Sequence, residues 1–197
     1  MNKFIPNNHL DLGCGNLPRN PYNAKILYGL DIRKFNDTDN IKYVTANLSF
    51  EPIPFESDFF CSVSAFEFIE HVPRVLYDPN LKETFYPFMR LMNEVYRVLR
   101  QGGRFYAVTP CYPSEESFRD PTHVNYISSK THYYFCGDDP IGRIYGFTGN
   151  FRMLTVQRGV LRNFYDPNRN LLFQKAAYIR RLLTNQLNYV KWEFEKY

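Results

Sequence analysis

His-Leu-Asp-Leu-Gly-Cys-Gly, residues 9–15, is the stretch that decides the fold. A short apolar run that ends at two glycines indicates a buried strand followed by a tight turn, at which the backbone closely approaches a ligand. A dinucleotide-binding fingerprint would place a third glycine three residues after Gly15. Pro18 stands there instead. The stretch therefore predicts a ligand-binding loop that differs from an ordinary dinucleotide site.

Short apolar runs separated by turn residues continue beyond this loop. Residues 26–32, 41–48, 59–66 and 104–109 are each predicted to form a buried strand. Residues 78–100 place apolar side chains at helical spacing, and Gly102 with Gly103 ends this predicted helix. Strands that alternate with helical or loop crossovers predict a parallel sheet covered on both faces.

The last third of the chain has a different organisation. Residues 113–140 are rich in polar and aromatic side chains, and we expect an acceptor-site insertion at about 113–150. Residues 151–161 and 189–197 are predicted strands joined by a helix at 170–187, which would finish the sheet with an antiparallel edge. No linker interrupts the chain, so residues 1–197 are expected to form a single domain.

Polar side chains follow the predicted strands, where ligands bind in open α/β sheets. Asp31 follows the second strand and can accept two hydrogen bonds from ribose hydroxyls. Charge-assisted bonds of this kind contribute about 1.5–3 kcal/mol each. Asn47 and Leu48 follow the third strand and can contact the edge and the face of a base. Residues 65–71 add two acids and a histidine after the fourth strand, so the strand ends together predict a nucleoside pocket.

Four segments of residues 9–113 resemble, in order, the motifs of class I S-adenosylmethionine-dependent methyltransferases of the type 11-like group. They are LDLGCG, YGLDI, ANLSFEPIPFESDFFCSVSAFEFIEHV and EVYRVLRQGGRFYAVTP. The resemblance implies an α/β, Rossmann-like, doubly wound, mostly parallel seven-stranded sheet with an antiparallel C-terminal edge hairpin. It also implies S-adenosyl-L-methionine as the cofactor and S-adenosyl-L-homocysteine as the product.

The same resemblance implies where the parts of the cofactor lie. The glycine loop and Asp11 would line the methionine side, Asp31 the ribose, and Asn47 with Leu48 the adenine. The predicted cofactor-binding residues are Asp11, Gly13, Cys14, Gly15, Asp31, Ile32, Asn47, Leu48, Phe66 and Glu67.

Pro18 also fits this cofactor. S-adenosylmethionine has no phosphate, so the third glycine that lets a helix N-terminus approach a pyrophosphate is not required. Residues 16–25 contain Pro18 and Pro21 and leave barely enough length for a crossover helix before the next strand. We predict an abbreviated, irregular connection where related enzymes have a long helix.

Methyl transfer from a sulfonium is an in-line displacement, in which orientation of the acceptor supplies roughly 7–11 kcal/mol. A general base adds about 10²–10⁴ in rate. His123 and His71 are the predicted catalytic residues. Each also has a structural interpretation, as a hydrogen-bonding group for His123 and as a brace at a helix start for His71. Arg119, Asp120 and Tyr126 are predicted to contact the acceptor.

Composition restricts the class of protein further. The chain has 197 residues, of which 44% are hydrophobic, and this favours a folded globule. The four cysteines form no C-x-x-C pair and the histidines lie at no ligand spacing from them, so no metal site is expected. Buried free thiols predict a reducing, cytoplasmic location. The chain has neither a run of 18 apolar residues nor a signal peptide, so we expect no membrane partner.

The acceptor is the least determined part of the sequence interpretation. Residues 109–113, TPCYP, differ in order and place from the N-P-P-Y loop of nucleic-acid amino-methyltransferases, so we expect a small molecule and no nucleic acid. Arg119, Arg143 and Arg152 favour an anionic acceptor such as a phosphate or a sugar phosphate. The segment GCGNLPRNP is also similar to methyltransferases of bacterial surface-polysaccharide pathways.

Two alternatives remain open at the level of sequence. Residues 143–197 contain ten Lys and Arg but three Asp and Glu, although the net charge of the whole chain is only +4. This basic C-terminal part could serve an RNA or protein methyltransferase, or it could be a solvated surface. A nonenzymatic S-adenosylmethionine-binding protein is the other alternative. The sequence does not indicate an oligomeric state.

Overall fold

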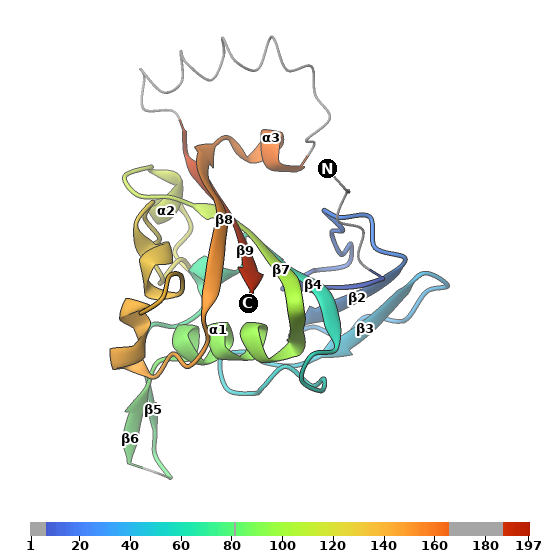
Figure 1. Cartoon of the computed structure of the whole chain (residues 1–197), viewed down its shortest axis with the longest axis horizontal. Coiled ribbons are helices and arrows are strands. Elements are labelled where there is room, and N and C mark those ends of the chain that lie inside the picture. Colours follow the sequence, from blue (N-terminus) through green and yellow to red (C-terminus); the bar gives the residue numbers. More distant parts are fainter. Residues whose placement is uncertain (1–6, 81, 166–186) are drawn as a thin grey trace.

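The computed structural model describes residues 7–80, 82–165 and 187–197. Seven strands form one sheet in the order β3-β2-β1-β4-β7-β9-β8. Its strands are β1 (Asn8–Leu12), β2 (Ile26–Asp31), β3 (Ile41–Thr45), β4 (Phe60–Phe66), β7 (Leu99–Pro110), β8 (Phe151–Gly159) and β9 (Tyr189–Lys196). The first five strands in this order, β3 to β7, are parallel to one another, and β9 pairs antiparallel with both β7 and β8. The predicted mostly parallel sheet with an antiparallel edge hairpin is confirmed (Figure 1).

The register brings the carboxyl ends of the parallel strands to one edge of the sheet. Leu12 lies opposite Leu30 on β2 and Ala65 on β4, while Asp31 lies opposite Thr45 on β3. The loops that follow β1, β2, β3 and β4 therefore begin side by side. This is the edge at which the sequence places its candidate residues.

The sheet separates two groups of buried side chains. Every residue of β4 is buried, as expected for a parallel strand with both faces covered. Phe105 belongs to the large core, whereas the next residue of β7, Tyr106, packs in a smaller cluster with Phe66 and Phe164. Because successive side chains of a strand point to opposite faces, the two clusters lie on opposite sides of the sheet.

The helix predicted at 78–100 is shorter than expected. Helix α1 spans Pro87–Val98, and a hairpin of β5 (Leu76–Asp78) and β6 (Glu83–Phe85) precedes it. Pro87 occupies the first turn of α1, where its missing N–H costs nothing, and it would break a helix that continued through it. The hairpin projects away from the body of the molecule (Figure 1). Strand β7 also begins earlier than predicted, directly after α1.

The connection between β1 and β2 contains turns and bends and no helix, as predicted. Pro18 packs against β2 so closely that a Cβ on Gly29 would lie 2.6 Å from Pro18 Cγ. The Asn20 side chain accepts a hydrogen bond from Ala24 N and donates one to Ala24 O. The backbone N–H of Arg19 donates to Asp11 Oδ2 at 2.8 Å. These contacts hold the connection in place without a helix.

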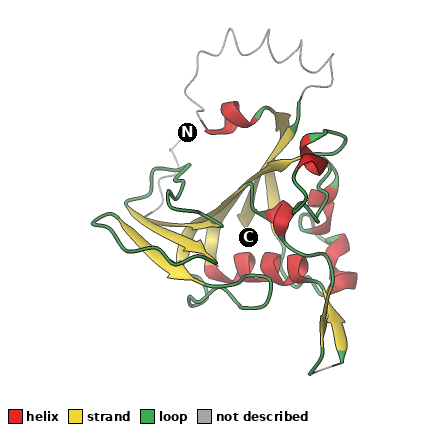
Figure 2. Ribbon diagram, turned by 180° about the vertical axis from the view of Figure 1, so that it is seen from behind, coloured by secondary structure: helices red, strands yellow, loops and turns green. Residues whose placement is uncertain are grey.

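Short helical segments follow β7 and β8. In chain order they are α2 (Glu116–Arg119), 3₁₀ turns at Thr131–Tyr134 and Ile141–Tyr145, and α3 (Leu161–Tyr165). Figure 2 shows α1 and most of these helical segments gathered at one side of the strands. The predicted strands at 151–161 and 189–197 are present as β8 and β9, while the helix predicted at 170–187 falls almost wholly outside the described residues.

All four cysteines are buried and free of disulfide bonds. Within the part of the chain that the structure describes, no helix combines the length and the hydropathy needed to cross a membrane.

Candidate functional site

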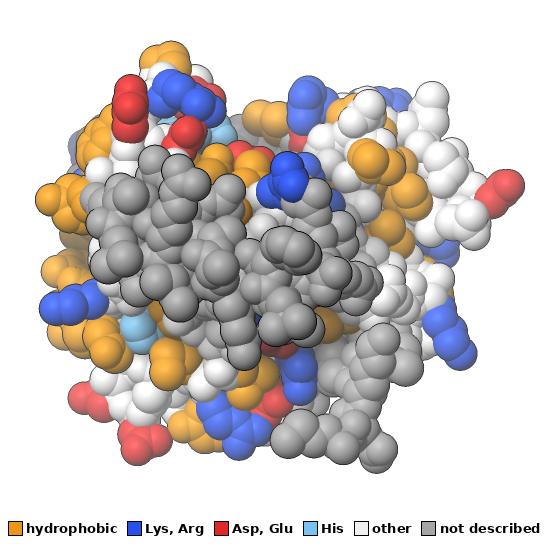
Figure 3. All heavy atoms as spheres, turned by 90° about the horizontal axis from the view of Figure 1, so that it is seen from above, with side chains coloured by type: hydrophobic (Ala, Val, Ile, Leu, Met, Phe, Trp, Pro, Cys, Tyr) orange, Lys and Arg blue, Asp and Glu red, His pale blue; other side chains and the backbone are white. Residues whose placement is uncertain are grey.

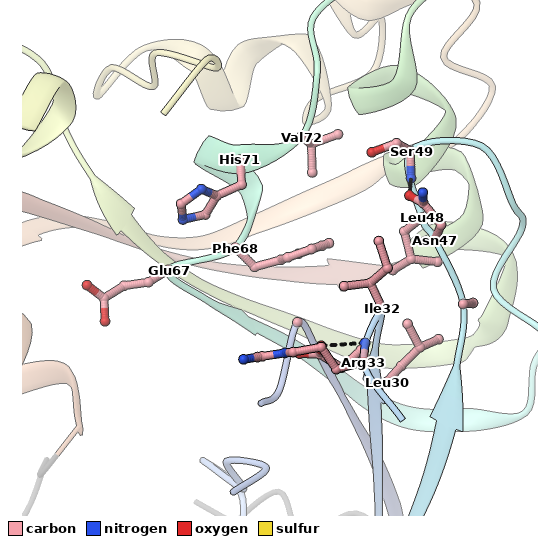
Figure 4. A pocket seen from close by; sticks show the side chains of 13 residues that line it. Leu30, Ile32, Arg33, Asn47, Leu48, Ser49, Glu67, Phe68, His71 and Val72 are labelled. Carbon is pink, nitrogen blue, oxygen red and sulfur yellow. Dashed lines mark hydrogen bonds and ion pairs between the residues drawn. The ribbon is translucent and has the colours of Figure 1, made fainter. Parts of the chain in front are cut away.

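A cavity of about 360 Å³ opens at the carboxyl ends of the parallel strands. Figure 4 shows Phe68 and His71 on one side of it and the loop of Asn47, Leu48 and Ser49 on the other. Seven residues that the sequence singled out contribute to its lining, namely Gly13, Asp31, Ile32, Asn47, Leu48, Glu67 and His71. The cavity therefore brings together residues from the ends of β1, β2, β3 and β4.

The glycine loop makes the close turn that the sequence predicted. Gly13 and Gly15 have φ values of 61° and 59°, in the region that favours glycine. A Cβ on Gly13 would lie 2.3 Å from Cδ2 of Phe68, so the ring of Phe68 packs directly on the loop. The Gly15 N–H donates to Asp31 Oδ2 at 2.9 Å, which connects the end of β1 to the end of β2.

Asp31 is the most heavily hydrogen-bonded carboxylate of the cavity. Besides Gly15, it accepts bonds from the N–H, Nε and Nη2 of Arg33 at 2.9–3.2 Å. Burial by itself would raise the pKa of Asp31, but the bonds from Arg33 and Gly15 outweigh it and lower that pKa. Asp31 is therefore ionised, and a ligand that uses its oxygens would compete with Arg33 for them. The sequence analysis missed Arg33, whose side chain is 67% exposed.

Asp11 lies beneath the cavity and does not line it. Its carboxylate accepts hydrogen bonds from Ser64 Oγ and from the backbone of Arg19. Ser64 also bonds to His9, whose other ring nitrogen bonds to Ser62. Burial raises the pKa of Asp11 to about 7, and burial likewise lowers the pKa of His9 to about 3. Asp11 therefore belongs to a buried polar network that supports the loop.

The loop after β3 offers the polar and apolar contacts that the sequence predicted. Asn47 Oδ1 accepts the Ser49 N–H at 3.1 Å, and this turn directs the loop around the cavity. Leu48 is buried, whereas the Ile32 side chain is 63% exposed although it is large and apolar. An exposed apolar side chain in a cavity is a suitable contact for the face of a flat ligand.

Glu67 adopts a backbone conformation that is uncommon for its residue type. Its φ is 48°, and strain of this kind concentrates at functional sites. Its carboxylate accepts hydrogen bonds from the hydroxyls of Tyr165 and Tyr189. Phe66, the preceding residue, is not part of the cavity lining because it points to the opposite face of the sheet. There it contacts Tyr165 at 5.1 Å between ring centroids.

Cys14 is also placed outside the cavity lining. Its thiol is buried and donates to the carbonyl of Gly15 at 3.1 Å, so it supports the turn. Burial raises the pKa of this thiol to about 12. Cys14 is therefore held as a neutral thiol at neutral pH.

The two predicted catalytic histidines lie together although 52 positions separate them in the chain. The ring centroids of His71 and His123 are 4.8 Å apart. His71 Nδ1 is 2.9 Å from Thr122 Oγ1, and Thr122 in turn donates to Asp120. Burial, together with the nearby His123, lowers the pKa of His71. His71 lines the cavity and so connects it to the insertion.

Glu70 is a buried acid beside this pair that the sequence analysis noted only as part of a motif. Its side chain is 2% exposed, and burial raises its pKa to about 8. Thr109 Oγ1 donates to Glu70 Oε2 at 2.9 Å. The sequence signal that could have identified it is the adjacency of Glu70 and His71 directly after a fully buried strand.

The three predicted acceptor-contacting residues lie in three different environments. Arg119 is exposed and pairs with Glu116 at 2.8 Å, within α2. Asp120 Oδ2 lies 4.0 Å from His123 Nε2, beside the histidine pair. Tyr126 lines a second cavity of about 520 Å³ with several other aromatic side chains. That cavity also includes Arg74, whose guanidinium carbon is 5.5 Å from the Tyr126 ring centroid.

Two other basic residues were expected to favour an anionic acceptor, and the structure contradicts this for Arg152. Arg152 lies opposite Glu195 on β9, which lies opposite Arg104 in the amino-terminal half of β7. Strand β8 runs in the same direction as β7, so Arg152 is at the edge of the sheet away from the cavity, and the prediction that it favours an anionic acceptor there is wrong. Arg143 pairs with Asp139 at 3.5 Å. On the face shown in Figure 3, the described basic side chains are dispersed among acidic and hydrophobic ones.

The structure of this chain is similar to solved structures, although its sequence matches no known family. No family model and no curated protein matches the sequence. Among solved structures, a chain in the complex that contains the Haloferax volcanii Trm112 methyltransferase activator matches with a TM-score of 0.60. It is 15% identical, and the match covers 98% of this chain and 83% of that one.

Two further structures match over most of this chain. A SAM-dependent methyltransferase from Archaeoglobus fulgidus matches with a TM-score of 0.56 and 15% identity, over 96% of this chain and 86% of that one. Geranyl diphosphate C-methyltransferase from Streptomyces coelicolor matches with a TM-score of 0.54 and 14% identity, over 97% of this chain and 73% of that one. That structure contains Mg²⁺, geranyl diphosphate and S-adenosyl-L-homocysteine. Together with the strand order, these matches show that the chain has the fold of class I S-adenosylmethionine-dependent methyltransferases.

Proposed function

We propose that this protein binds S-adenosylmethionine in the cavity at the carboxyl ends of β1–β4 and transfers its methyl group to a small acceptor. The strongest support is that the end of each of the first three strands carries a residue suited to one part of this cofactor. The cavity has a glycine loop after β1, an ionised Asp31 as the last residue of β2, and Asn47 with Leu48 after β3. A methionine tail, a ribose and an adenine require contacts of these kinds in this order.

The residues present fit that cofactor. The left-handed turn at Gly13 and Gly15 lets the backbone approach a ligand, and Asp31 offers two carboxylate oxygens to a pair of ribose hydroxyls. The ribose would replace the guanidinium of Arg33, which is largely exposed and free to turn into solvent. Bound S-adenosylmethionine supplies a methyl group on a sulfonium sulfur.

The chain's own part in the reaction is to orient the acceptor and to receive a proton. In the proposed displacement, the bond from the methyl carbon to sulfur breaks as the bond from that carbon to the acceptor oxygen or nitrogen forms. The sulfur leaves as a neutral thioether, and the acceptor proton goes to a base or to water. His123 and His71 are our candidates for positioning the acceptor and for receiving this proton.

We propose a small acceptor with an anionic group and an apolar or aromatic body. The second cavity supports this because it combines Arg74 with aromatic side chains. Asn125 contributes to this cavity and also donates its amide to the carbonyl of Ile69, next to Glu70. A phosphate or a sugar phosphate, such as those of surface-polysaccharide pathways, has the charge that Arg74 would bind.

The basic C-terminal part offers less support for an RNA acceptor. Arg143, Arg152 and Lys196 each pair with a carboxylate, so their charges are partly neutralised within the fold. A steep loss of RNA affinity with increasing salt would nevertheless favour that alternative over the small molecule.

Calorimetry with S-adenosylmethionine and S-adenosylhomocysteine tests the proposed cofactor. We expect saturable binding of both, and the absence of heat with either would overturn the proposal. A screen that follows cofactor consumption in the presence of phosphorylated and sugar metabolites then tests turnover. Binding without consumption of any acceptor would favour the nonenzymatic alternative.

A further inference from the structure

Three side chains that metals prefer meet beside the cofactor cavity. Glu70 and His71 belong to the 3₁₀ turn at Ile69–His71, and His123 comes from the insertion after β7. One potential ligand atom from each lies within 4.8 Å of the other two. Ligand atoms around a bound ion lie about 2.0–2.2 Å from it, so modest side-chain rotations would bring the three to one ion.

Two atoms of this cluster are buried without any hydrogen-bond partner among the described residues. They are Glu70 Oε1 and His123 Nδ1. A buried polar atom that has no partner costs about 1–3 kcal/mol, so native structures rarely leave two of them in one cluster of side chains. A shared cation would satisfy both atoms at once.

Other polar atoms of the three side chains already have partners outside the cluster. Glu70 Oε2 accepts from Thr109 Oγ1, and His71 Nδ1 bonds to Thr122 Oγ1, each at 2.9 Å. The free ring nitrogen of His71 is therefore Nε2. His123 Nε2 faces the carboxylate of Asp120 at 4.0 Å, which leaves Nδ1 as its free nitrogen. Metal-binding imidazoles are commonly oriented in this way by a partner on the second nitrogen.

The backbone fixes the two halves of the cluster to each other. The N–H groups of Val124 and Asn125 both donate to the carbonyl of Glu70, at 3.0 and 2.9 Å. The side-chain amide of Asn125 donates to the carbonyl of Ile69 at 3.1 Å. These bonds hold the segment that contains His123 against the turn that contains Glu70 and His71, so the cluster is preorganised.

We propose that Glu70, His71 and His123 form a binding site for one divalent transition-metal ion. Two imidazoles and one carboxylate suit Zn²⁺, Co²⁺, Fe²⁺ or Mn²⁺, and three protein ligands leave coordination positions open. Cysteine and histidine spacing predicts no metal site in this sequence, because these ligands come from segments 52 residues apart.

The site would act on the acceptor because His71 also lines the cofactor cavity. An oxygen of the acceptor at an open position would be held next to that cavity, and the ion would favour its deprotonated form. The histidines would then act as ligands, and the acceptor proton would pass to water. This role rests on the proposed methyl transfer, whereas the binding of the metal itself does not.

Cobalt binding provides the direct test. The full chain, freed of metal with a chelator, is titrated with Co²⁺ while its visible absorption is followed, and Zn²⁺ is added in competition. We expect one equivalent of Co²⁺ with ligand-field bands, which Zn²⁺ displaces. Glu70→Gln, His71→Ala and His123→Ala should each weaken binding by tenfold or more. Thr122→Val should weaken it by about tenfold through the orientation of His71.

His132→Gln is the matched control. It changes a histidine of the same insertion whose Nδ1 bonds to the carbonyl of Ser129 and which is not a member of the cluster. This variant should bind Co²⁺ as the parent does. The parent should also melt at a higher temperature when Zn²⁺ is added, and Glu70→Gln should not.

The outcomes separate this inference from the proposed function. Stoichiometric Co²⁺ binding that the three ligand variants lose supports the metal site, even if calorimetry finds no S-adenosylhomocysteine binding. Cofactor binding together with absent or variant-independent Co²⁺ binding would overturn the metal site and leave the proposed function standing. In that case the cluster is a hydrogen-bonded brace between the two segments.

Discussion

The two sides of the candidate site are constructed differently. On the side of β1, β2 and β3, each contact residue lies at the end of its strand or within three residues of it, and short turns such as Gly13–Gly15 help to position these residues. On the side of β4 and β7, the cluster depends on a long insertion that hydrogen bonds attach to the turn after β4, as between Thr122 and His71. The proposed cofactor side is therefore built from residues that are local in sequence, whereas the proposed acceptor side is assembled from segments that are far apart in the chain.

The largest effect should come from the glycine loop. Gly13→Ala would strain a residue at φ 61° and also place a methyl group 2.3 Å from the Phe68 ring. We expect a loss of S-adenosylhomocysteine affinity of a hundredfold or more, measured by calorimetry, because the loop must move to relieve the contact.

Gly102→Ala is the control for the backbone strain. Gly102 has φ 71°, but a Cβ there would meet no atom within 4 Å. Gly102→Ala should lower the free energy of unfolding by about 1–2 kcal/mol through strain alone, Gly13→Ala should lower it by at least as much, and only Gly13→Ala should lose the ligand. If both variants bound S-adenosylhomocysteine with equal affinity, the contact between the loop and Phe68 would not determine the shape of the cofactor site.

The second effect concerns the support beneath that loop. Asp11 has a pKa of about 7 in the folded chain and an ordinary value near 3.8 when unfolded. Between these values the folded state holds a proton that the unfolded state has released, so stability falls as the pH rises from about 4 to 7. The slope for one group is about 1.4 kcal/mol per pH unit.

Asp11→Asn removes this titration. We expect denaturant unfolding to show the variant gaining stability relative to the parent as the pH rises through this window, with little further change above pH 7. If the difference in unfolding free energy between the two proteins did not change with pH, the pKa of Asp11 would not be raised in the fold. Asp11 would then be ionised there, because its hydrogen bonds offset the effect of burial on its pKa.

The third effect tests the ribose contact. Asp31→Ala should weaken S-adenosylhomocysteine binding by about tenfold or more, because it removes charge-assisted hydrogen bonds. Arg33→Ala is the matched variant, since Arg33 is the residue that occupies the same carboxylate. It should retain the parent affinity or exceed it. If both variants lost S-adenosylhomocysteine affinity to the same extent, the ion pair, and not the carboxylate alone, would determine the shape of the pocket.

The smallest effect addresses the acceptor side. Asn125→Ala removes the bond to the Ile69 carbonyl and should lower turnover about fivefold through poorer orientation, while cofactor affinity stays within twofold. Asn93→Ala is its control, because Asn93 makes a comparable bond to the carbonyl of Gly146 outside both cavities. A change in cofactor affinity for Asn125→Ala would show that the two sides are not independent.

The cofactor side could be predicted because its signals are local in sequence. Each strand is an apolar run, and Asp31 and Asn47 stand directly after two of them, so position along the chain gives position in space. The irregular connection between β1 and β2 followed in the same way from its prolines. Arg33 and Phe68 were missed because nothing local distinguishes an exposed arginine or one more phenylalanine from an ordinary loop residue.

The acceptor side depends on contacts that no spacing rule encodes. His123 was named from its polar surroundings, but its proximity to Glu70 and His71 exists only once β7 and the insertion are folded. The hairpin before α1 was hidden for a different reason. Apolar residues at helical spacing extended the expected helix through Pro87, whose backbone cannot continue one.

The ion pair between Arg33 and Asp31 has a consequence for how affinity responds to ionic strength. A ligand that uses the Asp31 carboxylate must displace an exposed guanidinium, so part of its affinity is lost to that competition. Added salt screens an exposed pair more than it screens hydrogen bonds inside the cavity. Moderate salt should therefore leave cofactor affinity unchanged or raise it, and Arg33→Ala should abolish the rise.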